Sequence, residues 1–219
     1  MSTETVSRYE IIENLPAESA LVLHNRSWED YEGLLDAVGE NSGLRIWFDS
    51  GGLHITTLSP AHATYEDLIQ DIVRLVSLRM RIKLLSFGSV TMKLGRKKKG
   101  VEPDHCFYVQ SADAIKGKND IDFSTDPPPD VVVEIDLHHE SLSKLPIYVA
   151  LGVSEIWRYD GQRVVIYHLE ADQYVVAAGS LALPILTADV LTEFLTRCQQ
   201  EDQYEALLAF EAWLGNQQL

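Results

Sequence analysis

The chain has 219 residues, of which 46% are hydrophobic. This length suffices for one well-buried core and does not require two, so we expect a single domain over residues 1–219. Acidic residues outnumber basic ones by 33 to 18, and the net charge of −15 argues against a protein that coats nucleic acid nonspecifically. The first residues, MSTETVSRYE, lack a basic segment followed by an apolar run, and nowhere do about 18 uncharged apolar residues follow one another. We therefore expect a cytoplasmic protein that is neither secreted nor membrane-spanning.

The two cysteines, Cys106 and Cys198, are far apart in the sequence and have no metal-ligand spacing. This excludes a disulfide framework and a structural zinc site of the usual patterns, and it fits reduced thiols. Cys106 could be a nucleophile, but no histidine arrangement that would activate it can be argued from the sequence. A buried cysteine within a strand is the preferred interpretation.

The first elements are predicted from capping residues and periodicity. Ser27 is a typical N-cap, and it predicts a helix that ends near Gly39. Residues 44–58 alternate apolar and polar side chains around a Ser-Gly-Gly turn, which predicts a β-hairpin. Residues 60–83 carry apolar residues at helical spacing and form the longest predicted helix.

The middle of the chain is rich in predicted strands. Residues 84–94 and 101–109 are two expected strands, separated by a basic run at Arg96, Lys97, Lys98 and Lys99. We interpret this run as a solvated hairpin tip. A loop rich in Asp, Lys and Pro then leads to residues 130–137, whose β-branched composition is typical of a buried central strand.

The remaining elements complete a mixed pattern of helices and strands. The expected helices are 141–153, which Gly152 would end, and 187–199 and 201–215; the expected strands are 154–160, 163–170 and 173–178. This order predicts an α/β or α+β domain, with a mixed central sheet flanked by helices and with additional elements at both ends.

Carboxylates recur inside the apolar strands. Because alternate residues of a strand share a face, Glu134 and Asp136 point the same way, as do Asp104 and Cys106 in the neighbouring predicted strand. A carboxylate buried without a partner costs several kcal/mol. A hard divalent cation such as Mg²⁺ or Mn²⁺ would offset this cost if the two strands are adjacent.

Further polar residues could join such a site. Glu66 borders the buried stripe of the long helix and could complete the metal shell or hold it indirectly. Lys144 could reach back to assist the attack of water on phosphorus, or it could cover its own helix with its aliphatic stem. His62 is interpreted as a helix-start residue in preference to a site residue, and His138 and His139 as exposed loop residues.

Aromatic residues in the strands have two interpretations. Trp47, Trp157 and Tyr159 could stack on nucleic-acid bases. Their positions in alternating strands favour a place in the core or in an interface.

Several motifs together resemble the Uma2 family of endonucleases. These are SPAH at 59–62, EPD at 102–104, PPDVVVEID at 128–136 and SLSKLPIYVALGVSEIWRYDG at 141–161. The resemblance extends from about residue 55 to 170, which it marks as the core of the domain.

The resemblance implies a restriction-endonuclease-like fold of the PD-(D/E)xK type, in which two acids on neighbouring strands hold a metal ion. It implies that Asp104 and Glu134 are metal ligands and catalytic residues. The family pattern has a lysine two residues after the second acid, where this chain has Asp136. The resemblance therefore implies that Lys144 supplies the displaced lysine. If Lys144 does not reach the site, metal binding could survive without cleavage, and Asp136 could be a third ligand or a like-charged neighbour with a raised pKa.

Three functional hypotheses follow. The first is an endonuclease that cleaves phosphodiester bonds of nucleic acid, with DNA expected, through a metal-activated water, with Glu66 as a further participant. The second is a non-catalytic binding or oligomerisation module, which the net charge and the displaced lysine favour. The third is metal-dependent hydrolysis of another anionic substrate. The apolar end of the chain suggests a homodimer, although the same residues could cap the domain's own sheet: Leu207, Leu208, Phe210, Trp213 and Leu214.

Overall fold

In the computed structural model, the described residues are 12, 15–39 and 43–217. Most of the N-terminal stretch in which we expect no signal peptide lies outside them. None of the helices in the described part of the chain is long and apolar enough to cross a membrane.

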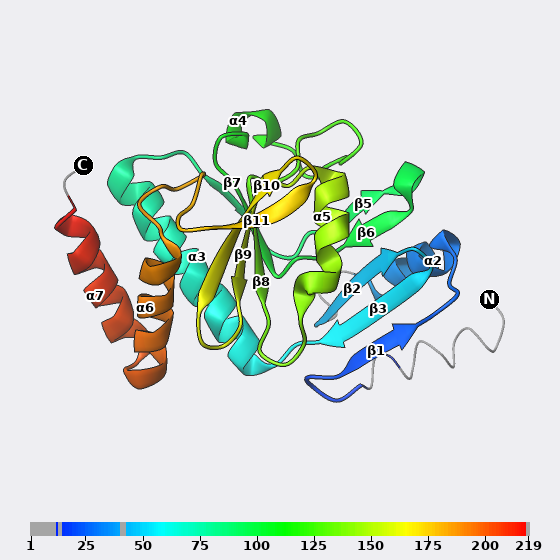
Figure 1. Cartoon of the computed structure of the whole chain (residues 1–219), viewed down its shortest axis with the longest axis horizontal. Coiled ribbons are helices and arrows are strands. Elements are labelled where there is room, and N and C mark those ends of the chain that lie inside the picture. The colour runs from blue at the N-terminus through cyan, green and yellow to red at the C-terminus, as the bar shows by residue number, and fades with distance from the viewer. Residues whose placement is uncertain (1–11, 13–14, 40–42, 218–219) are drawn as a thin grey trace.

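A six-stranded sheet forms the centre of the molecule, in the order β11-β10-β9-β8-β7-β4 (Figure 1). Its strands are β4 (Leu85–Phe87), β7 (His105–Tyr108), β8 (Val131–Ile135), β9 (Glu155–Tyr159), β10 (Val164–Glu170) and β11 (Gln173–Ala177). β8 pairs with β9 in parallel and with β7 antiparallel, so the sheet is mixed. The prediction of a buried central strand at 130–137 is confirmed, since every residue of β8 is buried.

A second, five-stranded sheet has the order β1-β3-β2-β6-β5. Its strands are β1 (Ala20–Leu23), β2 (Leu44–Asp49), β3 (Gly52–Thr57), β5 (Met92–Leu94) and β6 (Lys99–Val101). The predicted hairpin is confirmed as β2 and β3, whereas the edge strand β1 was not predicted. The basic run forms the tip between β5 and β6 and includes the short 3-10 helix η1 (Gly95–Lys97).

The prediction of two continuous strands at 84–94 and 101–109 is wrong. Each segment is divided, and its two halves belong to different sheets. The second division falls at Pro103, which has no N–H to donate to a sheet. Next to it, the Glu102 carboxylate accepts hydrogen bonds from the backbone N–H of Ile46 (2.8 Å) and from the Thr91 hydroxyl (2.7 Å). This short connection therefore belongs to both sheets.

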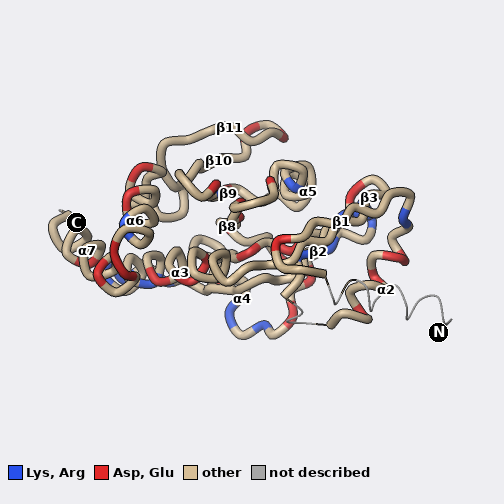
Figure 2. Tube along the Cα trace, turned by 90° about the horizontal axis from the view of Figure 1, so that it is seen from below, with Lys and Arg blue, Asp and Glu red and all other residues tan. Residues whose placement is uncertain are grey.

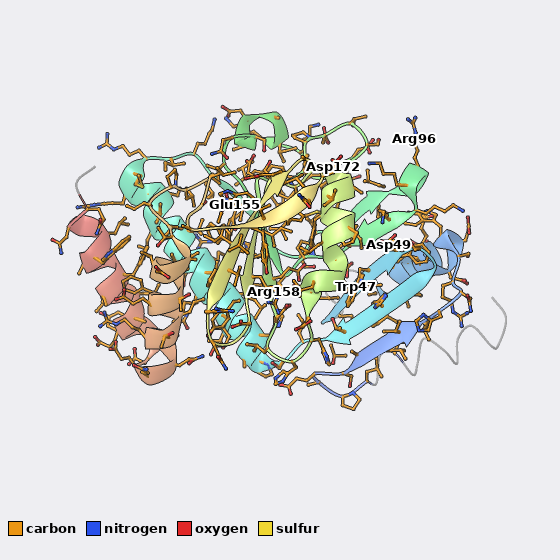
Figure 3. The ribbon with its side chains drawn as sticks, viewed as in Figure 1. Trp47, Asp49, Arg96, Glu155, Arg158 and Asp172 are labelled. Carbon is orange, nitrogen blue, oxygen red and sulfur yellow. The ribbon has the colours of Figure 1, made fainter. Side chains whose placement is uncertain are left out.

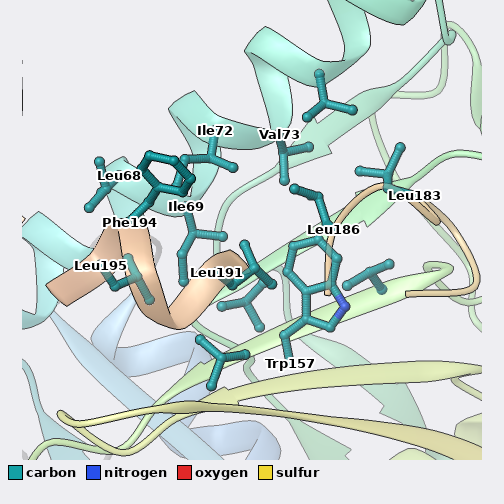
Figure 4. Packing of buried hydrophobic residues seen from close by; sticks show 14 of the residues in the cluster. Leu68, Ile69, Ile72, Val73, Trp157, Leu183, Leu186, Leu191, Phe194 and Leu195 are labelled. Carbon is teal, nitrogen blue, oxygen red and sulfur yellow. The ribbon is translucent and has the colours of Figure 1, made fainter. Parts of the chain in front are cut away.

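Helices cover both faces of the six-stranded sheet. On one face lie α3 (Pro60–Met80), α6 (Ala188–Gln200) and α7 (Gln203–Gly215). Their apolar residues pack with Val131, Val133 and Trp157 in the largest core cluster (Figure 4). On the other face, α5 (Leu145–Leu151) packs against Val132. Phe210 and Leu214 of α7 are part of the largest cluster, so they do cap the domain's own core.

The helix ends follow the sequence signals. Ser27 and Asp30 form a capping box at α2 (Trp28–Val38). Ser59 caps α3, in which Pro60 is the first residue. The helix expected over 141–153 begins instead as the 3-10 turn η2 (Ser141–Lys144), and Gly152 ends α5 with φ of 79°.

Two residues, Asp130 and Gly100, fix the positions of neighbouring strands. The loop between β7 and β8, which contains α4 (Ala112–Ile115), is tied at its base by Asp130. One oxygen of Asp130 accepts hydrogen bonds from the backbone N–H groups of Val109 (2.6 Å) and Ser111 (3.0 Å). In β6, Gly100 lies under Tyr31 of α2, whose hydroxyl would be 2.3 Å from a Cβ at position 100.

Candidate active site

Asp104 and Glu134 are neighbours across two paired strands. His105 of β7 is opposite Val133 of β8, and the backbone N–H of Asp104 donates to the carbonyl of Val133 at 3.2 Å. The Asp104 Oδ2 atom in turn accepts a hydrogen bond from the N–H of Ile135 at 2.7 Å. Both carboxylates are buried. The expected adjacency of the two strands is thus confirmed, while the metal-binding roles of the two acids stay predictions.

Lys144 reaches the same place from η2. Its Nζ donates hydrogen bonds to Glu134 Oε2 at 2.6 Å and to the carbonyl of Glu102 at 3.3 Å. The ammonium also lies 5.1 Å from the centre of the Trp47 ring, which is buried. Lys144 itself is 4% exposed. The alternative in which this lysine only covers its own helix is therefore wrong.

Tyr148 is a member of the site that the sequence analysis missed. Its hydroxyl donates a hydrogen bond to Glu134 Oε1, so both oxygens of Glu134 have a partner. Burial raises the pKa of Glu134 to about 8, with the charges of Asp104 and Asp136 adding to the effect and that of Lys144 opposing it. Tyr148 comes four residues after Lys144, a spacing that places two helical side chains on one face and could have indicated it.

Two basic side chains contact the other oxygen of Asp104. Arg45 Nε donates to Oδ1 at 3.1 Å, and His62 Nε2 lies 2.9 Å from the same atom. Burial alone would raise the pKa of Asp104, but His62, Lys144 and Arg45 hold it well below its usual range. The sequence analysis preferred a helix-start role for His62 to a role in the site. The structure shows both, because its backbone N–H donates to the Ser59 side chain and its ring lies at Asp104.

Glu66 contacts the site through other residues. One of its oxygens lies 3.6 Å from Arg45 Nη2, and the other lies 3.2 Å from His105 Nδ1. Arg45 therefore links Glu66 to Asp104. Of the two roles that the sequence suggested for Glu66, this geometry favours the one in which Glu66 holds the metal shell indirectly.

Asp136 organises the turn that carries Lys144. Its Oδ2 accepts hydrogen bonds from the backbone N–H of Ser141 (2.8 Å), from the Ser141 hydroxyl (3.1 Å) and from Arg158. Figure 3 labels Arg158 on β9, the strand parallel to β8. Asp136 thus has a structural role in addition to any role as a ligand.

A pocket of about 50 Å³ opens between these groups. Its lining includes the following polar side chains, of which His138 and His139 belong to the exposed turn after β8: Arg45, His62, Asp104, Glu134, Asp136, His138, His139 and Lys144. This volume can hold a small cation with one or two waters, at about 10–15 Å³ for each. In the described part of the chain, no group of three or more His, Cys, Asp or Glu side chains has a geometry ready to hold a metal ion.

Burial decides between the interpretations of the strand aromatics, of Cys106 and of His138 and His139. Trp47, Trp157 and Tyr159 are buried in the core. Cys106 is a fully buried strand cysteine, and burial raises the pKa of its thiol. His138 and His139 are exposed, as expected, and both contact Glu18.

The resemblance to the Uma2 family is confirmed by a comparison with protein families. The model of the Uma2 family, described as "Putative restriction endonuclease", matches residues 28–196. The chain belongs to the Uma2 family. The match covers all the Uma2 motifs quoted above, the two acids and Lys144.

A solved structure supports the fold assignment. A protein from Anabaena variabilis ATCC 29413, described as a "putative nuclease belonging to DUF820", superposes with a TM-score of 0.51 at 14% sequence identity. The superposition covers 74% of this Uma2 chain and 96% of that chain. The fold is therefore restriction-endonuclease-like, with a mixed sheet between helices. A comparison with curated proteins finds no match.

Proposed function

We propose that this chain is a divalent-metal-dependent nuclease that hydrolyses phosphodiester bonds, with DNA as its expected substrate. One observation carries the proposal: Asp104, Glu134 and Lys144, from three separate segments, converge on one pocket. The description of the Uma2 family and that of the Anabaena protein both support a nuclease.

The residues of the pocket fit a hard cation. Asp104 and Glu134 provide carboxylate oxygens on adjacent strands, and Asp136 adds a third carboxylate to the lining. Burial raises the pKa of Glu134, and Asp104 and Asp136 add to the effect, so a bound cation would favour its charged form. Mg²⁺ or Mn²⁺ would be held by Asp104 and Glu134, with Asp136 as a further ligand. When bound, the cation would supply Lewis acidity toward the phosphate and the attacking water.

Lys144 would act as a fixed positive charge. Burial opposes a charged lysine, but the charges of Glu134 and Asp104 raise its pKa, so it keeps its proton at neutral pH. A protonated lysine can stabilise the negative charge that develops on the phosphoryl oxygens, and it can orient water by donating a hydrogen bond. It cannot serve as a general base in this state.

The other residues would position these three. Asp136 binds the first residue of η2 and so holds the turn that ends in Lys144. Arg45 and His62 hold one oxygen of Asp104 in the absence of a metal ion. Glu66 supports Arg45 from α3. These contacts restrict the side chains of Asp104 and Lys144 before substrate binds.

The first test is a calorimetric titration of Mn²⁺ into the wild type and into Glu134→Gln and Asp104→Asn. Asp172→Asn is a matched control, because Asp172 is exposed in the turn between β10 and β11, where Figure 3 labels it. We expect binding to be lost in the two site variants and kept in the control. A plasmid-nicking assay with the same four proteins should follow the same order.

The outcomes separate the hypotheses. Metal binding and nicking that both depend on Glu134 support a nuclease. Binding of metal and DNA without any cleavage points to the non-catalytic module. Negligible Mn²⁺ binding in the wild type would overturn the metal site.

A further inference from the structure

A second hollow lies at the end of β2 that is remote from the candidate active site. Its volume is about 260 Å³. It is formed by the tip of the β2–β3 hairpin, the start of α2 and the basic run between β5 and β6. We call it the basic hollow, and its lining residues are Arg26, Ser27, Trp28, Phe48, Asp49, Ser50, Gly51, Lys97, Lys98 and Lys99.

The basic hollow has a charge opposite to that of the chain. Acidic positions recur along much of the trace, as Figure 2 shows, and the net charge is −15. The described lining of the hollow instead contains four cationic side chains and a single carboxylate, Asp49. Lys99 neutralises that carboxylate at 2.5 Å. A net positive charge from Arg26, Lys97 and Lys98 therefore remains, in a concave surface where the field is strongest.

Two of these cations have surroundings that a solvated hairpin tip does not require. Lys97 Nζ donates a hydrogen bond to the carbonyl of Ala150 at 2.9 Å, which ties the basic run to α5. The Nε atom of Arg26 is buried and has no hydrogen-bond partner among the described residues. A buried donor without an acceptor needs a partner from outside the chain, such as a water or an anion. Lys98 is exposed beside it.

The spacing relates the basic hollow to the candidate active site. Arg45, near the start of β2, contacts Asp104, and Asp49, at the end of the same strand, lines the hollow. Four residues of strand span about 13 Å at 3.3 Å each. A separation of this size can be bridged by a single DNA strand, so one strand can reach both places.

We propose that the basic hollow binds a backbone phosphate of the nucleic-acid substrate, on the same strand as the phosphate that is cleaved. This inference rests on the proposed nuclease function. Arg26 and Lys98 donate to the phosphate oxygens, while Lys97 and Lys99 hold the turn in shape. Such a contact positions the substrate without reading its sequence. It also gives a strongly acidic chain a local positive surface that a polyanion can contact.

The test is fluorescence anisotropy with a labelled 20-base-pair duplex in Ca²⁺, at several salt concentrations. The test variant is Arg26→Gln with Lys98→Gln. The control is Arg163→Gln with Lys116→Gln, which removes the same charge from two exposed positions outside the hollow. We expect about tenfold weaker binding for the test variant and a slope of log K against log salt that is smaller by one to two. The control should stay within twofold of the wild type.

Equal effects of the two double variants would overturn the inference, because they would indicate only a loss of overall charge. So would binding of inorganic phosphate in the hollow, measured by calorimetry, with unchanged duplex affinity. The proposed nuclease function can fail separately: if plasmid nicking is absent and Mn²⁺ does not bind, a duplex affinity that depends on Arg26 and Lys98 would still support the basic hollow.

Discussion

Lys144 Nζ lies 2.6 Å from Glu134 Oε2, although ten residues separate the two in the chain. Asp136 makes this possible. It directly follows β8, and its carboxylate accepts a hydrogen bond from the backbone N–H of Ser141 at the start of η2. The chain is thereby folded back on itself, and the lysine approaches the strand from a helical turn. A lysine two residues after Glu134 would lie directly after β8, whereas here a helical turn supplies the positive charge.

Replacing this lysine should remove cleavage and leave metal binding intact. In Lys144→Met the side chain loses its ammonium group and keeps an unbranched apolar stem. We expect the rate of plasmid nicking to fall by about 10²- to 10³-fold, the usual effect of removing one group that stabilises transition-state charge. Mn²⁺ affinity, measured by calorimetry, should stay within about threefold. Nicking at the wild-type rate would show that Lys144 has no catalytic role.

The stability of the protein should depend on pH through Glu134. Burial raises the pKa of this carboxyl to about 8, against about 4.3 in an unfolded chain. A group with a raised folded-state pKa contributes stability below its unfolded pKa, and this contribution is lost as the pH rises through the folded value. The wild type should therefore lose on the order of 2 kcal/mol more than Glu134→Gln between pH 6 and pH 8. Urea unfolding of both proteins with chelator present measures the difference, and parallel pH profiles would contradict it.

Tyr148 should matter for stability more than for chemistry. In Tyr148→Phe, Glu134 loses one of its hydrogen-bond partners inside the core. We expect the free energy of unfolding to fall by about 1–2 kcal/mol and nicking to fall by less than in Lys144→Met. Tyr204→Phe is the control, because Tyr204 is exposed on α7 and its change should be near zero. A loss of nicking equal to that of Lys144→Met would assign Tyr148 a direct role in cleavage.

Gly100 should tolerate no larger residue. A Cβ at this position would lie 2.3 Å from the Tyr31 hydroxyl, whereas a Cβ at Gly95 in the same hairpin would meet nothing within 4 Å. Gly100→Ala should therefore lower the free energy of unfolding by about 1–3 kcal/mol, the usual range for overpacking. Gly95→Ala should change it by less than about 0.5 kcal/mol. Urea unfolding checks both, and similar values for the two variants would contradict the packing argument.

The local part of this structure was predictable from sequence, and the long-range part was not. The β-branched composition of residues 130–137 identified the strand that carries Glu134, and caps such as Ser27 identified helix ends. Neither signal carries information on which sheet a strand joins, so the division of the chain at Pro103 between two sheets was missed. Arg45 was missed for the same reason, since it meets Asp104 only after 59 residues of intervening chain have folded.

Asp130 acts as a clamp that keeps the pairing of β7 with β8 independent of the length of the loop between them. Asp130, directly before β8, accepts hydrogen bonds from the backbone N–H groups of Val109 and Ser111, which follow β7. The two ends of the connecting segment are thereby held together. Residues added beyond that clamp, for example near Gly117, would enlarge the loop without changing which residue of β7 faces which residue of β8. Asp104 would remain opposite Glu134. The exposed positions 116–120 are therefore a place where a tag, a reporter or a recognition element could be inserted while the two acids keep their spacing.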